Sequence, residues 1–422
     1  MAAGIHSTVK SLQNRLLLRW CPKWYGAFSD PVGGFYERLG KDFKPVLTGQ
    51  RRLVTQCRQL AVYSHAARGM TKTSYRDLEK QFDFILGHYR DDATRLWHFA
   101  LEDNAAVADR TCDLYALSFV IFSFSHYYLA TGEERAMTAA RDVLTLIDTK
   151  FRYKEYAGFA EALDARGQIL PKMRRQNPHM HLLEACLFAY ETWKDEAYLV
   201  MADEIVGLFQ KYFYDEKNNV VIEFFSDNLF PHIERGDYVE PGHAFEWIWL
   251  LKKHADIKGD PAMHDAVALR LLENANAHGW DEKYGGIYDM LALDGRVATD
   301  TKRIWPFCEA LKANALMLSV APDRQGIKDR VAEMVGTFKG KYMQKRGFWT
   351  EWLSRDLSPA TDYMPGTTPY HVYFGITETM EILEKRGAMI SYGGKFESAA
   401  YALRRTLSKG ARSLRNIISE RA

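Results

Sequence analysis

The chain has 422 residues, of which 47% are hydrophobic and 13% aromatic, so it is long enough and apolar enough to bury a large core. Its 56 Lys and Arg residues nearly balance 54 Asp and Glu residues, which gives no overall bias toward nucleic acid or a membrane surface, so we expect small or neutral partners. No segment approaches 18 uncharged apolar residues, and the five cysteines form no CxxC pair or metal-finger spacing, so we expect reduced thiols, no membrane span and a cytoplasmic protein.

The chain begins with a predicted helix over residues 1–20, outside the pattern that follows. Its apolar run Leu16-Leu17-Leu18 is too short for the hydrophobic region of a signal peptide. A Gly/aromatic or apolar patch then recurs six times, and its markers are Gly34, Trp97, Gly158, Val221, Gly286 and Phe348. The intervals between successive markers are 63, 61, 63, 65 and 62 residues, which indicates six repeated units.

A strongly apolar helix is predicted after each patch. These helices cover about 54–67, 113–130, 178–193, 242–254, 305–319 and 370–383. Amphipathic helices follow several of them, at 134–151, 196–212, 261–278 and 324–342. Helices that are apolar nearly all round belong inside and one-sided helices cover them, so the pattern predicts two rings.

Six helical hairpins form either an open solenoid or a closed toroid. An open array needs polar capping repeats, whereas here the first and last units look like the interior ones. We therefore expect an all-α fold, an (α/α)6 barrel, as a single domain over residues 1–422. From about residue 387 the sequence predicts a basic helical extension with Lys395, Arg404, Arg405, Lys409, Arg412, Arg415 and Arg421, which fits a solvated or subunit-packing tail better than a surface for anionic partners.

Polar residues at the starts of the inner helices are the candidates for chemistry. They are Arg58, Asp113, Tyr115, His179, His181, Glu184, His243, Glu246, Trp305, Glu309 and His371. An unpaired charge in an apolar helix costs several kcal/mol, so the charged members must pair or line a wet cavity. Parallel inner helices would bring these residues to one mouth of the barrel.

Three histidines occupy matching places in repeats three, four and six, because His181 and His243 are 62 residues apart and His243 and His371 are 128 apart. Imidazoles are suited to moving protons near neutral pH. Two of them could take a proton from the carbon beside a sugar carbonyl and return it elsewhere. Arg58 would polarise the carbonyl oxygen, and Glu246, at i+3 from His243, and its counterparts would orient the rings.

Other interpretations stay open at this point. Single histidines can be hydrogen-bonded helix residues without a chemical role. Three imidazoles and a carboxylate can bind zinc, although no HxxxH or HExxH spacing occurs and His179 and His181 should point to different helical faces. Glu184, Glu246 and Glu309 could serve a glycosidase as acid and base. A barrel that only binds a partner is a further alternative, since a fold does not define a function.

The same residues resemble the N-acylglucosamine 2-epimerase superfamily. The matching motifs are Gly33-Gly-Phe35, Arg51-Arg52, Gln56-Cys-Arg-Gln-Leu60, Asn177-Pro-His-Met-His-Leu-Leu-Glu-Ala185, Glu240-Pro-Gly-His-Ala-Phe-Glu-Trp247, Gly285-Gly-Ile-Tyr-Asp289, Lys302-Arg-Ile-Trp-Pro306 with Glu309, and Tyr370-His-Val-Tyr373. The resemblance implies an (α/α)6 barrel that works without a metal or another cofactor. Dimerisation would fit the family.

The resemblance also implies residue roles. His243 and His371 are similar to the family's acid/base pair, and Arg58 to the arginine that contacts the substrate oxygen. His181 resembles the third active-site histidine, with Glu246 and Glu309 as supporting carboxylates, Trp305 as a sugar-contacting aromatic and Asn177 at the rim. Tyr115 and Glu184, from the set at the helix starts, are also expected to bind substrate.

The residues Ala244-Phe245 make the central motif look more like D-mannose isomerases than cellobiose epimerases. The expected reaction is reversible D-mannose/D-fructose isomerisation of an unphosphorylated sugar, although Lys302 and Arg303 leave a charged substrate open. His371 would take the C2 proton to form a cis-enediol, and reprotonation at C1 would give the ketose. Reprotonation at C2 by His243 would instead give the epimer, so a 2-epimerase of N-acylglucosamine, mannose/glucose or cellobiose is the alternative, and a glycoside hydrolase the remote one.

Overall fold

The computed structural model describes residues 2–69, 75–321 and 323–391. Met1–Met380 form one compact unit, and Glu381–Ala422 form a second, of which the structure describes residues 381–391 at the end of a helix. The basic residues predicted for the C-terminal extension, from Lys395 to Arg421, lie outside the described residues, so that extension stays a prediction.

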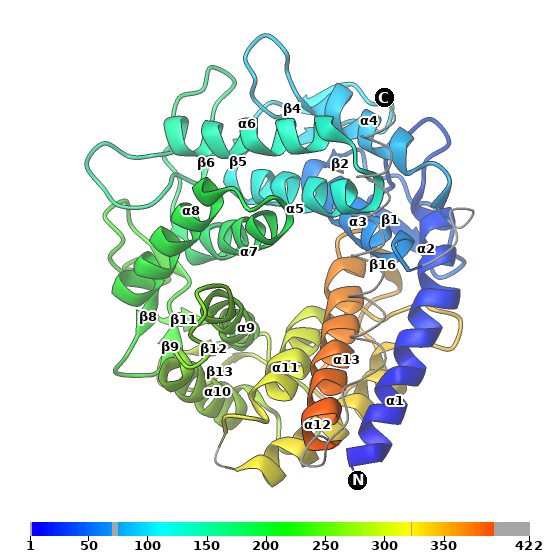
Figure 1. The fold of residues 1–422 in the computed structure, drawn as a ribbon, viewed down its shortest axis with the longest axis vertical. Helices are drawn as coiled ribbons and strands as arrows, with labels where there is room; N and C mark the ends of the chain where they lie inside the picture. Colours follow the sequence, from blue (N-terminus) through cyan, green and yellow to red (C-terminus); the bar gives the residue numbers. More distant parts are fainter. Residues whose placement is uncertain (1, 70–74, 322, 392–422) are drawn as a thin grey trace, which may run out of the picture. The chain divides into compact units, whose positions relative to one another are not determined.

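Six apolar helices form the inner ring of the first unit (Figure 1). They are α3 (Leu53–Ala67), α5 (Leu114–Thr131), α7 (Gln176–Trp193), α9 (Pro241–Ile257), α11 (Ile304–Met317) and α13 (Pro369–Ser391, of which residues up to 380 belong to this unit). The ring closes where α13 meets α3, because His65 Nδ1 lies 2.8 Å from the Tyr373 hydroxyl. Helix α9 begins at Pro241, slightly earlier than predicted, because the fixed φ of proline suits a first helical position.

Amphipathic helices cover this ring from outside. They are α4 (Leu78–Tyr89), α6 (Glu134–Lys150), α8 (Glu196–Leu208), α10 (Asp265–Gly279) and α12 (Arg324–Thr337), with π-helical turns at Phe209–Phe213 and Phe338–Tyr342. The N-terminal segment, α1 (Ala2–Arg15), a π-helical turn (Leu16–Trp20) and α2 (Cys21–Phe28), supplies the sixth outer element. The helix predicted over residues 1–20 is present as α1 and the π-helical turn. Trp24 of α2 donates to the Gly347 carbonyl at 2.7 Å and packs edge-on against Trp349, so the N-terminal segment packs against the sixth Gly/aromatic patch.

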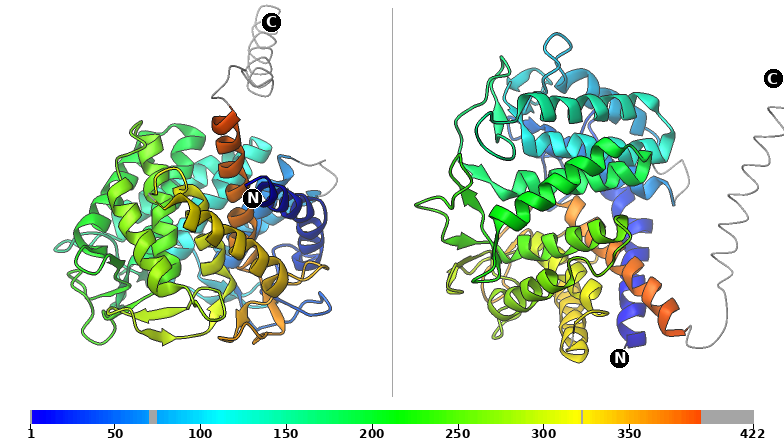
Figure 2. Two further views of the ribbon diagram at one scale, coloured as in Figure 1. Left: turned by 90° about the horizontal axis from the view of Figure 1, so that it is seen from below. Right: turned by 60° about the vertical axis from the view of Figure 1, so that its left-hand side comes forward.

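Short antiparallel strand pairs join each repeat to the next at one end of the helices (Figure 2). The strand before an inner helix pairs with the hairpin of the following repeat: β2 (Arg51–Arg52) with β3 (Ala100–Leu101), β5 (Cys112–Asp113) with β6 (Ala162–Leu163), β7 (Arg174–Arg175) with β10 (Phe224–Phe225), β11 (Tyr238–Val239) with β12 (Met290–Ala292), and β14 (Lys302–Arg303) with β15 (Trp352–Leu353). Strands β4 (Val107–Asp109) and β13 (Val297–Thr299) extend two of these sheets, and β8 (Tyr214–Asp215) pairs with β9 (Val220–Val221). The last link is β16 (Tyr363–Pro365) with β1 (Arg38–Gly40), in the register Arg38 to Pro365, so repeat six returns to repeat one. The chain is the predicted (α/α)6 barrel.

The recurring glycines have a structural reason. Gly34 and Gly158 adopt φ values of 73° and 72°, and an added Cβ would lie 2.3 Å from Arg51 Nη2 and 2.6 Å from Arg174 Nη2 respectively. Both guanidinium groups are buried, and each donates to a backbone carbonyl of its own patch. The glycines therefore let a buried basic side chain anchor each hairpin at the mouth of the barrel.

Helix α5 corrects one expectation. Leu114–Thr131 contains 18 residues without Asp, Glu, Lys or Arg, so by length and composition it could cross a bilayer, contrary to our expectation for the chain. In the structure 72% of this stretch is buried inside the protein. It is an inner-ring helix, for which an apolar surface all round is required.

Candidate functional site

A cavity of about 170 Å³ opens to solvent at the N-terminal ends of the inner helices. It is lined by Arg58, Tyr115, Asn177, His181, Glu240, His243, Glu246, Arg303, Trp305, Glu351, Thr367, Thr368 and His371. Eight of the ten predicted site residues are therefore in one hollow. The other two, Glu184 and Glu309, do not line it, because each lies behind a histidine and hydrogen bonds to that ring.

The Glu309 carboxylate orients His371 from the side of the ring that faces away from the cavity. Its Nδ1 lies 2.8 Å from Glu309 Oε1, and Lys312 Nζ lies 2.7 Å from the other oxygen of Glu309. Burial raises the pKa of Glu309, but Lys312 and His371 outweigh it and hold this pKa at about 2. Burial, opposed by Glu309 but aided by Arg58, lowers the pKa of His371 to about 4. His371 is therefore neutral at pH 7, donates Nδ1–H to Glu309 and keeps the lone pair of Nε2 free to act as a base.

His243 has a different partner and the opposite protonation tendency. Its Nδ1 lies 2.9 Å from both oxygens of Glu223, which Gln176 Nε2 also contacts at 2.9 Å. Burial alone would lower the pKa of His243, but the charges of Glu223 and Glu240 raise it above the ordinary value. Glu246 does not contact this ring, so the expected pairing within one helix was wrong. His243 is thus placed as a proton donor.

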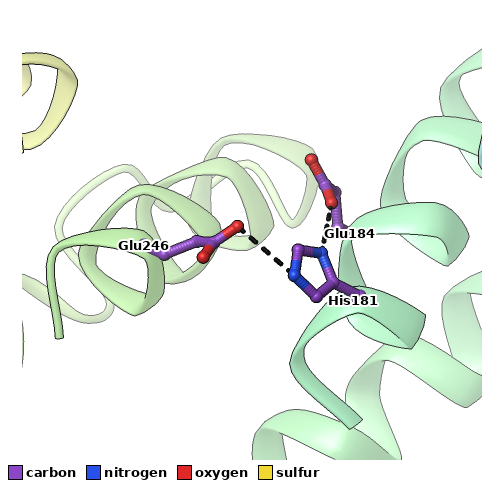
Figure 3. A group of neighbouring side chains, drawn as sticks. All are labelled: His181, Glu184 and Glu246. Atoms are coloured by element: carbon purple, nitrogen blue, oxygen red, sulfur yellow. Dashed lines mark hydrogen bonds and ion pairs between the residues drawn. The ribbon is translucent and has the colours of Figure 1, made fainter. Parts of the chain in front are cut away.

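Glu246 instead approaches His181 (Figure 3). His181 Nδ1 lies 2.9 Å from Glu184 Oε2, and its Nε2 lies 3.7 Å from Glu246 Oε1. Burial, with Arg58 and His243 nearby, lowers the pKa of His181 well below its ordinary value. Burial raises the pKa of Glu246 well above its ordinary range, with further contributions from Glu309 and Glu184. Burial therefore favours the neutral form of both the His181 imidazole and the Glu246 carboxyl group.

Arg58 is the uncommitted cation of the cavity. Its Nη2 donates to the Tyr115 hydroxyl, and its guanidinium carbon lies 4.3 Å from the Phe119 ring and 4.8 Å from the Tyr370 ring. Among the described residues no carboxylate forms an ion pair with it, and its Nε is buried without a partner. A desolvated guanidinium surrounded by aromatic faces suits an oxygen that gains negative charge.

Two further predicted residues complete the wall. The Trp305 ring lies 4.9 Å from the His243 ring and 5.5 Å from the His371 ring, measured between centroids. Gly242 permits this position, because a Cβ there would lie 2.7 Å from the indole. Asn177 lines the cavity, and its buried Oδ1 has no hydrogen-bond partner in the part of the chain that the structure describes. An aromatic face and an unpaired amide are typical contacts for a sugar.

Two overlapping groups have the geometry to hold a metal ion, since their donor atoms lie within 4.8 Å of one another. They are His181, Glu184 and Glu246, and Glu246, Glu309 and His371. The donors are already engaged, however: Glu184 accepts from His181 and Tyr370, and Glu309 pairs with Lys312. The ammonium of Lys312 supplies the positive charge that a metal would bring. His179, a candidate from the helix starts, does not line the cavity, and its Nε2 accepts from the Phe159 amide, so His179 and His181 point to different sides of α7 as expected.

Several residues of the site were missed from the sequence: Glu223, Glu240, Arg303, Lys312, Glu351, Thr367 and Thr368. Arg303 was considered only as a contact for a charged substrate, but it pairs with Asp289 and Glu240. A signal for the carboxylates exists, because acidic residues recur at 37, 161, 223, 289 and 351, close to multiples of the repeat length. These carboxylates lie in the hairpins and not at the helix starts, where the predicted site residues lie.

The sequence and the fold of this chain are similar to those of known sugar isomerases and epimerases. The sequence model of the N-acylglucosamine 2-epimerase family matches residues 34–375. Mannose-6-phosphate isomerase of Rhizobium meliloti is 29% identical over 400 residues, which are 91% of this chain and 100% of the relative. D-mannose isomerase of Marinomonas mediterranea is 24% identical over 385 residues, 84% of this chain and 92% of the relative. The structure of cellobiose 2-epimerase from Bacillus thermoamylovorans superposes with a TM-score of 0.81 at 20% identity, covering 90% of this chain and 99% of that one, which shows the shared fold.

Proposed function

Because the chain belongs to the N-acylglucosamine 2-epimerase family, whose named relatives are sugar isomerases and epimerases, we propose that this isomerase interconverts D-mannose and D-fructose. The observation that carries the proposal is a pair of imidazoles, His371 and His243, that contact one tryptophan ring in one cavity, with the pKa of His371 lowered to about 4 and that of His243 raised above its ordinary value. An uncommitted guanidinium lines the same cavity.

Proton abstraction follows from the state of His371. Its Nε2 lone pair takes the C2 proton of the open-chain sugar, and the imidazolium that forms is stabilised by the Glu309 carboxylate at Nδ1. The carbonyl oxygen gains negative charge in the same step. Arg58 stabilises that charge, because no carboxylate of the described residues forms an ion pair with its guanidinium. The product of the step is a cis-enediolate, and a proton passed from the O2 hydroxyl to O1 through solvent in the open cavity prepares the C2 carbonyl of the ketose.

The fate of the enediol decides the product. The Nε2 proton of His371 exchanges with solvent through the open cavity, and delivery of the exchanged proton to C1 gives the ketose. C1 and C2 are adjacent, so one base can serve both carbons. A proton delivered to C2 by His243 gives the 2-epimer. The charged state favoured for His243 supports epimerisation of mannose/glucose, cellobiose or an N-acylglucosamine as the second candidate function.

The proposed function is tested by NMR of the purified protein with D-mannose in heavy water. We expect fructose deuterated at C1. We also expect at least tenfold lower kcat/KM for D-mannose 6-phosphate, because Arg303 is already paired with Asp289 and Glu240, while the Glu240 and Glu351 side chains would repel a dianion. Glucose deuterated at C2 would make the enzyme an epimerase, faster turnover of the phosphate ester would reverse the substrate assignment, and no exchange with any aldose would reject the proposal.

Replacing Glu223 with glutamine tests the role of His243. Loss of the carboxylate leaves burial as the main influence, so the pKa of His243 should fall and the imidazole should lose its proton at neutral pH. We expect about ten- to hundredfold lower kcat at pH 7, with the alkaline limb of the pH profile moved to lower pH. Glu161→Gln is the matched control, because Glu161 occupies the equivalent hairpin position but pairs with Arg175. An alkaline limb that stays in place in Glu223→Gln would contradict the assignment.

A further inference from the structure

Carboxylates recur at equivalent hairpin positions of five repeats, and most of them form an ion pair with an arginine. They are Glu37, Glu161, Glu223, Asp289 and Glu351. Glu37 and Glu161 accept from both the backbone amide and the guanidinium of Arg52 and Arg175, which precede inner helices α3 and α7. Asp289 does the same for Arg303, which precedes α11. The two remaining members, Glu223 and Glu351, have no such arginine. Glu223 hydrogen bonds to His243, whereas Glu351 has no role in the steps proposed so far.

Glu351 lines the cavity with one oxygen uncommitted. Its Oε2 accepts from Thr368 Oγ1 at 2.6 Å and from Trp349 Nε1 at 3.1 Å. Its Oε1 has no hydrogen-bond partner among the described residues, and the residue is 5% exposed. The two hydrogen bonds fix the orientation of the carboxyl group. The geometry therefore offers one acceptor oxygen to a bound sugar.

The other carboxyl groups of the cavity are not available in this way. Glu240 lies 2.8 Å from the Arg303 guanidinium. Glu246 Oε2 is buried without a hydrogen-bond partner among the described residues, but burial and the neighbouring carboxylates Glu309 and Glu184 raise the pKa of Glu246 well above its ordinary range, which favours the protonated form over the base. The histidines serve the carbon chemistry. Opening of the sugar ring is the step for which no side chain has yet been assigned. It is necessary because hexoses exist mainly as rings, and the C2 proton is acidic only when C1 is a free carbonyl.

We propose that Glu351 is the base that opens the sugar ring, an inference that rests on the proposed function. Oε1 takes the proton of the C1 hydroxyl, the O1 electron pair forms the C1 carbonyl, and the C1–O5 bond breaks with its electron pair on O5. A solvent water in the open cavity protonates O5. The resulting hydroxide takes the proton from Glu351, so the step neither gains nor loses protons overall.

The surroundings of Glu351 suit a group that exchanges protons near neutral pH. Burial raises the pKa of Glu351 to about 7, while hydrogen bonds from Thr368 and Trp349 and the charge of Arg303 oppose the rise and Asp289 adds to it. Cys308 and Tyr342 are the other titratable groups that interact with it, and burial keeps both neutral.

The test compares a sugar that must open with one that cannot close. D-glyceraldehyde has three carbons and forms no five- or six-membered ring, so its C2 exchange in heavy water needs no ring opening. For Glu351→Gln we expect about 10²-fold lower kcat/KM with D-mannose and exchange of D-glyceraldehyde within about threefold of wild type. The primary isotope effect with 2-deuterated mannose should fall toward one in the variant, because ring opening becomes rate-limiting.

Proportional losses with both substrates, an unchanged isotope effect at reduced rate, or full mannose activity would each overturn the inference. Wild-type protein that exchanges C2 of neither substrate would instead reject the proposed function. Thr368→Val is the second variant, in case Glu351→Gln does not fold. Loss of its hydrogen bond should raise the pKa of Glu351, so mannose turnover should fall at pH 6 and recover at pH 8, with glyceraldehyde exchange unchanged. Equal pH profiles for both substrates would contradict the role.

Discussion

Replacing His371 with asparagine is expected to lower kcat for D-mannose by about 10²–10⁴-fold, the range typical for loss of a general base. The imidazole Nε2 is the lone pair that receives the C2 proton, and the asparagine amide has no comparable basicity. Exchange of the C2 proton with heavy water should fall by the same factor as kcat, because both depend on the same proton transfer. In the wild-type enzyme activity should decline as the pH falls through about 4, where His371 becomes protonated and loses its lone pair.

His65→Asn is the matched control for this variant. His65 lies on inner helix α3, burial lowers its pKa to about 4 as for His371, and it contacts Tyr373 rather than the cavity. Its replacement should lower the free energy of unfolding by about 1–3 kcal/mol and leave kcat within about threefold. If both variants lost activity equally, the effect would come from the loss of any buried imidazole, and His371 would not be the base.

The barrel and the convergence of its histidines were predictable because both follow from the repeat. A period near 62 residues places His181 and His243 at the same height in the inner ring, whatever the side chains between them do. The hydrogen-bond partners of these histidines were harder to predict from the sequence. The i, i+3 rule is right for His181 and Glu184 in α7 but wrong for His243 and Glu246 in α9, since Glu223 from a hairpin reaches His243 first.

The pairing of Lys312 with Glu309 and Glu378 also could not be predicted from the residues at the helix starts. Lys312 lies in the middle of α11, among residues that look like ordinary core, and its role depends on side chains from three inner helices. Sequence spacing gives the height of a residue in the barrel. It does not say which of several buried carboxyl groups pairs with the Lys312 ammonium. That pairing depends on differences of an ångström or two in the distances between the side chains.

Replacing Lys312 with methionine is expected to lower the free energy of unfolding by about 3–5 kcal/mol, the cost of leaving a buried charge without its partner. Lys312 Nζ lies 2.7 Å from Glu309 and 3.1 Å from Glu378, and its side chain is 4% exposed. Methionine preserves most of the volume, so the loss is electrostatic. Urea unfolding monitored by tryptophan fluorescence measures it.

The same variant should change the pH dependence of catalysis, which separates this charge network from ordinary stability. Without the ammonium, the negative charge of Glu309 favours a proton on His371, so the pKa of His371 should rise and the acid limb should move to higher pH. Lys252→Met is the control, because Lys252 is a buried lysine of α9 paired with Asp265 outside the cavity, and it should destabilise without moving that limb. Adding Glu309→Gln to Lys312→Met should restore part of the stability, since residue 309 no longer carries an unpaired charge, but not the activity, since His371 lacks its carboxylate. A Lys312→Met enzyme with wild-type stability and an unmoved acid limb would show that Glu309 does not depend on this ammonium.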